Sequence, residues 1–263
     1  MDENLKVLAH QVVEKIARKI KREAKEQFHA FGRTVGLGAD GTPTKYVDQL
    51  AEDIALKQIK KSKIKVNVLS EEAGFLDFGG DYTFVLDPVD GTRNAYRGIP
   101  LYAVSLAIGT EKISDVTYGI VKNIPTGDLF VSEKHHGAFF NGKPIQTCDC
   151  PPKDRVSSLT LGKNHDDITL SLSKHHIVRS LGSASLEMCM VAIGGLDYYV
   201  LGKSYLRVID IAAATLIVRE AGGFVKTIDG AELDMNFTLD ERTSLLVACS
   251  EEIVEEILAK QKT

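Results

Sequence analysis

The 263-residue chain contains no tryptophan, only 7% aromatic residues and four cysteines. No two of these cysteines have CxxC spacing, so no four-ligand zinc site is predicted. A few unpaired thiols are typical of a reducing compartment, which favours a cytoplasmic protein. The sequence has no run of about 18 apolar residues. Residues 1–31 also lack the apolar segment of a signal peptide, so we expect neither a membrane span nor secretion.

An excess of basic charge is also missing. The chain has 32 Lys and Arg against 36 Asp and Glu, a formal net charge of −4. Nucleic-acid-binding domains usually carry a basic stripe, so we expect no nucleic-acid partner. The lack of a long apolar run likewise predicts no membrane partner. At about 150 residues per domain, the length predicts one large fold or two halves that share a core.

Apolar periodicity places helices and strands along the first half. Residues 32–44 contain four glycines and predict a flexible loop between two helices. Alternating apolar residues over 102–140 predict an antiparallel meander. The predicted helices cover residues 2–30 and 46–61, and the predicted strands before the meander cover residues 63–70 and 82–86.

The segment Cys148–Asp154, with two consecutive prolines, is the predicted seam between two halves, 1–150 and 151–263. The first half has an α+β pattern. The second alternates strands and helices in an α/β-like way. Its predicted strands are 156–161, 196–201 and 244–248, and its predicted helices are 168–174, 184–193, 209–221 and 251–259.

Acidic residues follow apolar strands at two places and open a helix at a third. Glu71-Glu72 follows one strand, Asp87-Pro-Val-Asp90 ends another, and Asp210 precedes an apolar helix. Each motif alone has a simpler interpretation. Glu71-Glu72 would be a solvated turn, the Asp87–Asp90 stretch a β-turn, and Asp210 a helix N-cap. Taken together, they place carboxylates on one rim of a core. Their mutual repulsion would call for cations between them.

The stretch Asp87–Thr92 favours Mg²⁺ in particular. Pro88 fixes its own φ, and Gly91 permits a sharp reversal, so both aspartates can point the same way. The Val89 carbonyl adds a further oxygen, and all-oxygen ligation suits Mg²⁺. Two such ions can activate a water for hydrolysis of a phosphate ester.

These motifs, in this order, resemble the signatures of the inositol monophosphatase family. This is the Mg²⁺-dependent, lithium-sensitive superfamily that also contains fructose-1,6-bisphosphatases. The resemblance covers nearly the whole chain. It implies an α+β fold built as a five-layered αβαβα sandwich, and a homodimer. The residues that carry it are Glu71-Glu72, Asp87-Pro88-Val89-Asp90-Gly91-Thr92, Asn94, Asp210-Ile211-Ala212-Ala213 and Glu220-Ala221-Gly222-Gly223.

The resemblance also implies roles for individual residues. The metal ligands would hold two or three Mg²⁺ ions per site, or Mn²⁺ in their place. The catalytic residues would orient the attacking water. Gly91 and Thr92 would cradle the phosphate. The implied metal ligands are Glu71, Asp87, Val89, Asp90 and Asp210, and the implied catalytic residues are Asp48, Thr92 and Glu71.

Substrate specificity depends on the second half. Animal members carry a Glu that binds inositol hydroxyls seven residues before the second-half Asp, and here that residue is Lys203. A cation suits a second anionic group, which favours fructose 1,6-bisphosphate and inositol 1-phosphate as joint substrates of an archaeal type. The alternatives are a 3′-phosphoadenosine 5′-phosphate phosphatase and a catalytically idle Mg²⁺ or sugar-phosphate binding protein. The predicted substrate-binding residues are Asp90, Gly91, Thr92, Arg179, Ser183, Ala184, Lys203, Arg207 and Asp210.

Overall fold

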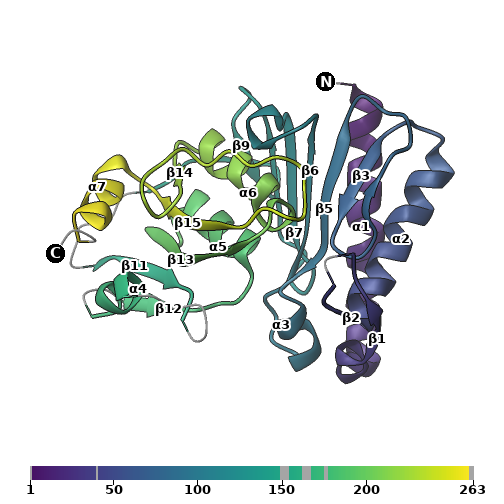
Figure 1. The fold of residues 1–263 in the computed structure, drawn as a ribbon, viewed down its shortest axis with the longest axis horizontal. Coiled ribbons are helices and arrows are strands. Elements are labelled where there is room, and N and C mark those ends of the chain that lie inside the picture. The colour runs from purple at the N-terminus through teal and green to yellow at the C-terminus, as the bar shows by residue number, and fades with distance from the viewer. Residues whose placement is uncertain (1, 40, 149–153, 162–166, 175–176, 261–263) are drawn as a thin grey trace.

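The structure is a computed structural model that describes residues 2–39, 41–148, 154–161, 167–174 and 177–260. Two long helices open the chain and lie side by side on one face of a large sheet (Figure 1). Helix α1 (Glu3–Gln27) begins at Asp2, whose side chain accepts the Asn4 amide, and it buries a single apolar stripe. No helix in the described ranges has the length and hydropathy that a membrane span requires.

The large sheet has eight strands in the order β10-β9-β8-β7-β6-β5-β3-β4. Strand β5 (Thr83–Asp90) lies inside the sheet and is buried along its whole length, because helices cover both of its faces. It pairs in parallel with β3 and antiparallel with β6. The other strands are β3 (Asn67–Ser70), β4 (Gly74–Leu76), β6 (Ala103–Gly109), β7 (Tyr118–Asn123), β8 (Leu129–Glu133), β9 (Ala138–Phe140) and β10 (Lys143–Ile145).

A second sheet of five strands has the order β12-β11-β13-β15-β14. Between the two sheets lie α5 (Ala184–Ala192) and α6 (Val208–Glu220), which contact both. On the outer side, α4 (Asp167–Leu172) and α7 (Glu251–Lys260) complete the stack. The five strands are β11 (Val156–Leu159), β12 (Ile177–Arg179), β13 (Tyr198–Leu206), β14 (Phe224–Lys226) and β15 (Thr243–Ala248).

The layers therefore run α1 and α2, eight-stranded sheet, α5 and α6, five-stranded sheet, then α4 and α7 (Figure 1). This arrangement confirms the predicted α+β fold with five αβαβα layers. The core forms two apolar clusters, one on each face of the large sheet. The proposed boundary at 150/151 lies outside the described residues and stays a prediction.

The segment 32–44 differs from the loop expected of it. A 3-10 turn, η1 (Phe28–Gly32), is followed by strands β1 (Thr34–Leu37) and β2 (Pro43–Lys45), which pair antiparallel. β-branched residues in both arms favour this hairpin over an irregular loop. Helix α2 (Tyr46–Ser62) starts directly after β2, so the hairpin fixes where α2 begins.

Candidate active site

The carboxyl end of β5 supplies two acidic side chains. Asp87 and Asp90 are 4% and 8% exposed. The chain then turns sharply at Gly91, whose φ is +91°, before α3 (Thr92–Arg97) begins. A Cβ at Gly91 would lie 3.0 Å from the Leu101 carbonyl oxygen, so both conformation and space require glycine here.

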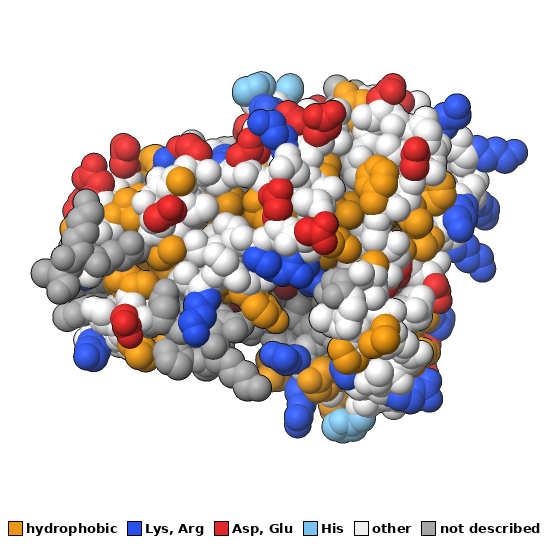
Figure 2. Space-filling view, in the orientation of Figure 1, with side chains coloured by type: hydrophobic (Ala, Val, Ile, Leu, Met, Phe, Trp, Pro, Cys, Tyr) orange, Lys and Arg blue, Asp and Glu red, His pale blue; other side chains and the backbone are white. Residues whose placement is uncertain are grey.

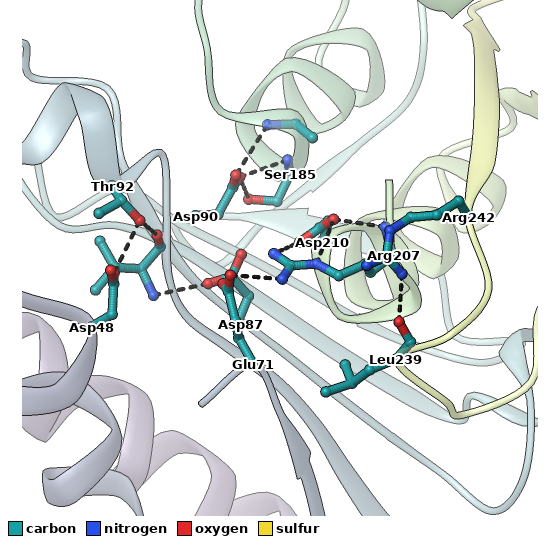
Figure 3. Close-up of polar contacts among 12 residues, drawn as sticks. Asp48, Glu71, Asp87, Asp90, Thr92, Ser185, Arg207, Asp210, Leu239 and Arg242 are labelled. Atoms are coloured by element: carbon teal, nitrogen blue, oxygen red, sulfur yellow. Dashed lines mark hydrogen bonds and ion pairs between the residues drawn. The ribbon is translucent and has the colours of Figure 1, made fainter. Parts of the chain in front are cut away.

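Asp48 and Thr92 meet from two different helices. Thr92 Oγ1 lies 2.9 Å from Asp48 Oδ1 and 3.1 Å from the Val89 carbonyl oxygen (Figure 3). Burial, with smaller contributions from the charges of Glu71 and Glu72, raises the pKa of Asp48 to about 8, although its bond to Thr92 acts the other way. A hydroxyl beside a carboxylate of raised pKa is an arrangement that can transfer a proton.

Arg207 lies between carboxylates from separate elements. Its Nη1 is 2.6 Å from Glu71 Oε1, and its Nη2 is 3.1 Å from Asp210 Oδ1 (Figure 3). Asp210 also accepts the Arg207 backbone N–H at 2.7 Å, which fixes the start of α6. The pKa of Arg207 is raised by these two carboxylates, because their charges and hydrogen bonds outweigh the effect of its burial.

Asp90 faces the start of α5. It accepts the Ser183 hydroxyl at 2.6 Å, the Ser185 amide at 2.8 Å and the Ala184 amide at 3.2 Å, together with the Ser185 hydroxyl. Figure 3 shows the contact with Ser185. Through these bonds the β5 motif of the first half is joined to the second half.

The site holds more negative charge than the chain neutralises. Burial and then the charges of Asp90, Asp210 and Glu71 raise the pKa of Asp87 well above its ordinary value, and Arg207 only partly opposes them. Burial raises the pKa of Asp90 to about 6 despite its hydrogen bonds from Ser183 and Ser185. Carboxylates that raise one another's pKa in this way are suited to binding an added cation.

The residues present fit Mg²⁺ by donor chemistry, since four carboxylates and the Val89 carbonyl are all oxygen donors. Among the described residues, no three His, Cys, Asp or Glu side chains already converge on one metal position. In this structure Arg207 engages Glu71 and Asp210, while Asp90 bonds to α5.

The predicted cations fall in different places. Arg207 lies in the centre of the acidic group, whereas Arg179 and Lys203 are exposed on β12 and β13. Within the described ranges, no ion pair joins Arg179 or Lys203 to the carboxylates. Figure 2 shows a hollow on the displayed face, with Lys and Arg side chains at its margin.

Glu187 was not predicted at all, and Ser185 was expected only as part of the segment 182–185 that opens a helix and resembles the family's substrate-contacting segment. Ser185 gives Asp90 both a backbone and a side-chain donor, and Glu187 binds the backbone just before α5. The signal for Ser185 was its place in the first turn of a predicted helix, where free N–H groups face outward. Nothing in the sequence pairs it with Asp90.

Comparison with known proteins identifies the relatives of this chain. The sequence profile of the inositol monophosphatase family matches residues 1–263. The chain belongs to the inositol monophosphatase family. It is accordingly a phosphatase, and enzymes of this family are metal-dependent, generally on Mg²⁺.

Two named relatives are similar to this chain over most of its length. A fructose-1,6-bisphosphatase/inositol-1-monophosphatase of Methanothermobacter thermautotrophicus is 37% identical over 241 residues, 86% of each chain. A bifunctional NADP phosphatase/NAD kinase of Methanococcus maripaludis is 34% identical over 92% of this chain. That alignment spans only 47% of the Methanococcus protein, about half of its length.

Solved structures of the family have the same fold. An inositol monophosphatase–fructose 1,6-bisphosphatase superposes with a TM-score of 0.84 at 31% identity, covering 98% of this chain and 99% of the other. A Pyrococcus horikoshii protein described as similar to inositol-1 monophosphatase also gives 0.84, at 33% identity and 98% coverage of both chains.

Proposed function

We propose that this phosphatase hydrolyses fructose 1,6-bisphosphate and inositol 1-phosphate in an Mg²⁺-dependent reaction. The observation that carries the proposal is the Thr92–Asp48 contact beside the buried carboxylates of β5. Mere binding of a phosphate ester has no need of a hydroxyl–carboxylate pair of this kind. The names of the archaeal relatives support these two substrates.

In this proposal the acidic residues hold two or three Mg²⁺ ions, or Mn²⁺. Bound Mg²⁺ would neutralise the carboxylates, polarise the phosphate and lower the pKa of a water. One ion would be held by Glu71, Asp87 and the Val89 carbonyl, a second by Asp87, Asp90 and Asp210, and a weaker third with help from Glu71. Cations held beside it would oppose the raised pKa of Asp48, so that this carboxylate could accept a proton.

Thr92 and Asp48 form the proposed proton path. The Thr92 hydroxyl donates to one of its two acceptors, Asp48 or the Val89 carbonyl, and its oxygen can accept from an attacking water. The proton passes to Asp48, the only member of the pair that can store it. The Gly91 and Thr92 backbone N–H groups would orient the phosphate.

The second half would recognise the rest of the substrate. Ser183 and Ala184 line the start of α5 and already contact Asp90, so they lie next to the phosphate motif. Arg179, Lys203 and Arg207 are the proposed cations for a second phosphate. Asp90 and Asp210 would each contact the bound ions and also the substrate itself.

A nucleotide phosphatase is the second candidate. Two relatives named bifunctional NADP phosphatase/NAD kinase are 34% and 35% identical over 92% of this chain. Such a substrate carries its phosphate on a ribose, as 3′-phosphoadenosine 5′-phosphate does. The carboxylate and Thr92 roles would be unchanged, and only the groups that bind the leaving alcohol would differ.

The first experiment compares phosphate release from fructose 1,6-bisphosphate, inositol 1-phosphate, NADP and 3′-phosphoadenosine 5′-phosphate, with Mg²⁺ or EDTA. We expect EDTA-sensitive rates on the first two. Asp48→Asn should abolish turnover while Mg²⁺ binding persists, whereas the control Asp53→Asn, on an exposed face of α2, should stay active. Preference for a nucleotide would overturn the substrate assignment. Mg²⁺ binding without turnover on any ester would support the idle binder.

Two broader properties remain proposals. We propose a homodimer, as the family resemblance implies, and a cytoplasmic location, as the reduced cysteines suggest. Sedimentation velocity at micromolar concentration tests the first: a single species near 58 kDa, about twice the 28.8 kDa chain, supports it, and a monomer contradicts it.

A further inference from the structure

Glu187 is a buried carboxylate outside every motif of the proposed reaction. Glu187 lies in the first turns of α5, next to apolar core residues, and is only 2% exposed. It accepts the amides of Leu181 at 3.0 Å, Gly182 at 3.2 Å and Ser183 at 3.2 Å, and also the Ser158 hydroxyl. No Lys or Arg of the described chain forms an ion pair with it. A charge buried in this way is retained only if its hydrogen bonds stabilise it.

Five consecutive backbone amides are divided between two carboxylates. Glu187 accepts those of residues 181–183, and Asp90 accepts those of Ala184 and Ser185. The first group is internal to the second half, whereas the second group reaches across to β5. None of the three backbone amides that Glu187 accepts is bonded to Asp90, so the two sets of backbone bonds are separate.

The segment held by Glu187 also touches the phosphate motif from its other side. Asn94 donates to the Leu181 carbonyl at 2.8 Å and to the Leu101 carbonyl at 2.7 Å. A Cβ added to Gly91 would lie 3.3 Å from the Gly182 carbonyl oxygen, so the two turns are nearly in contact. A shift of residues 181–183 would therefore move the donors that face the site.

We infer that Glu187 is a positioning residue: it fixes residues 181–183 so that the amides of 184 and 185 and the Ser183 hydroxyl stay aimed at the Asp90 side of the site. The family resemblance implies that the backbone at the start of α5 contacts hydroxyls of the substrate alcohol, so Glu187 would set where those contacts lie. This inference rests on the proposed function for its substrate, a polyhydroxylated phosphate ester. The three bonds from residues 181–183 stand independently of it.

Glu187→Gln tests the inference, because the amide keeps the size of the side chain but turns one acceptor into a donor that faces N–H groups. In protein freed of ions, we expect amide hydrogen exchange at 181–183 to be at least about tenfold faster. With Mg²⁺, we expect KM for fructose 1,6-bisphosphate to rise about tenfold and kcat to change less than about threefold.

Val191→Ala is the matched control. It removes buried apolar volume from the same helix and should lower stability without altering either exchange at 181–183 or KM. If Glu187→Gln does not fold, Glu187→Asp keeps the charge but retracts it and should change exchange and KM in the same direction.

Unchanged exchange in the Glu187 variants would overturn the inference, as would faster exchange with an unchanged KM. A KM rise of equal size in Val191→Ala would also overturn it, since general loosening would then explain the effect. If the native chain hydrolyses none of the esters, the proposed function fails, and the substrate role of Glu187 fails with it. The exchange result would in that case still decide whether Glu187 holds residues 181–183.

Discussion

Arg207 and Glu71 form an ion pair of 2.6 Å that joins the start of α6 to the turn after β3. The same guanidinium also contacts Asp210. The Arg207 side chain is therefore a positive charge among carboxylates that are proposed to bind several Mg²⁺ ions. Arg207 and Mg²⁺ would therefore compete for the same oxygens. This competition links the stability of the protein to its metal content.

Arg207→Ala should lower the free energy of unfolding in EDTA by about 2 kcal/mol, because buried carboxylates lose their counterion. In Mg²⁺ the loss should be smaller, and Mg²⁺ should bind more tightly to the variant. Urea unfolding in EDTA and in Mg²⁺ measures both effects. Arg242→Ala is the control, since Arg242 bonds to the carbonyls of Leu239 and Glu241. An equal loss in both buffers would contradict the competition.

Ion-free protein should become less stable between about pH 4 and pH 8. The pKa of Asp90 is raised to about 6 and that of Asp48 to about 8, so in this range the folded chain binds more protons than the unfolded chain. Stability then falls as pH rises. Urea midpoints in EDTA across this range test the slope. Asp48→Asn should flatten its upper part, and added Mg²⁺ should oppose the decline. Rising stability in EDTA would refute the assignment.

Thr92→Ala should lower kcat by roughly 10²-fold or more, because the water loses the hydroxyl that links it to Asp48. Thr92→Ser keeps that hydroxyl and should retain most of the activity. Steady-state kinetics on fructose 1,6-bisphosphate measures the loss of kcat. Calorimetry measures Mg²⁺ affinity and so distinguishes a lost proton path from weaker metal binding. If Ala and Ser variants lose activity equally, the hydroxyl has no role in proton transfer.

Lys203→Glu should shift specificity away from a bisphosphate. Reversing this exposed charge repels a second phosphate, so kcat/KM for fructose 1,6-bisphosphate should fall about tenfold. The value for inositol 1-phosphate should change much less. Lys57→Glu, on the surface of α2, controls for net charge. A parallel fall for both substrates would show that Lys203 acts elsewhere than on the second phosphate.

Periodicity predicted much of the fold. The stripe of Leu5, Leu8, Val12 and Ile16 predicted α1, and the apolar run before Asp87 predicted β5, because burial on one or both faces leaves a direct mark in the sequence. The hairpin β1–β2 was missed, since its four-residue and three-residue strands are too short for periodicity and its glycines favour a loop.

The site was predictable in part for a different reason. The motif around Asp87–Thr92 marks the oxygen donors locally, and a family resemblance supplies the distant partners. The pairing of Arg207 with Glu71 depends on how α6 meets the turn after β3, and the binding of Asp90 to Ser185 depends on how the two halves meet. Both follow from tertiary packing, which no local pattern encodes.

The apolar helix α6, enclosed between the two sheets, has a consequence for synthesis of the protein. The face of the large sheet that α6 covers is complete once β10 ends at Ile145, yet α6 itself ends at Glu220. At about 5–20 residues per second, a ribosome needs roughly 4–15 s to make that stretch. For those seconds the apolar face of the large sheet has no α6 to cover it, so this face can be fully buried only after most of the second half has been made.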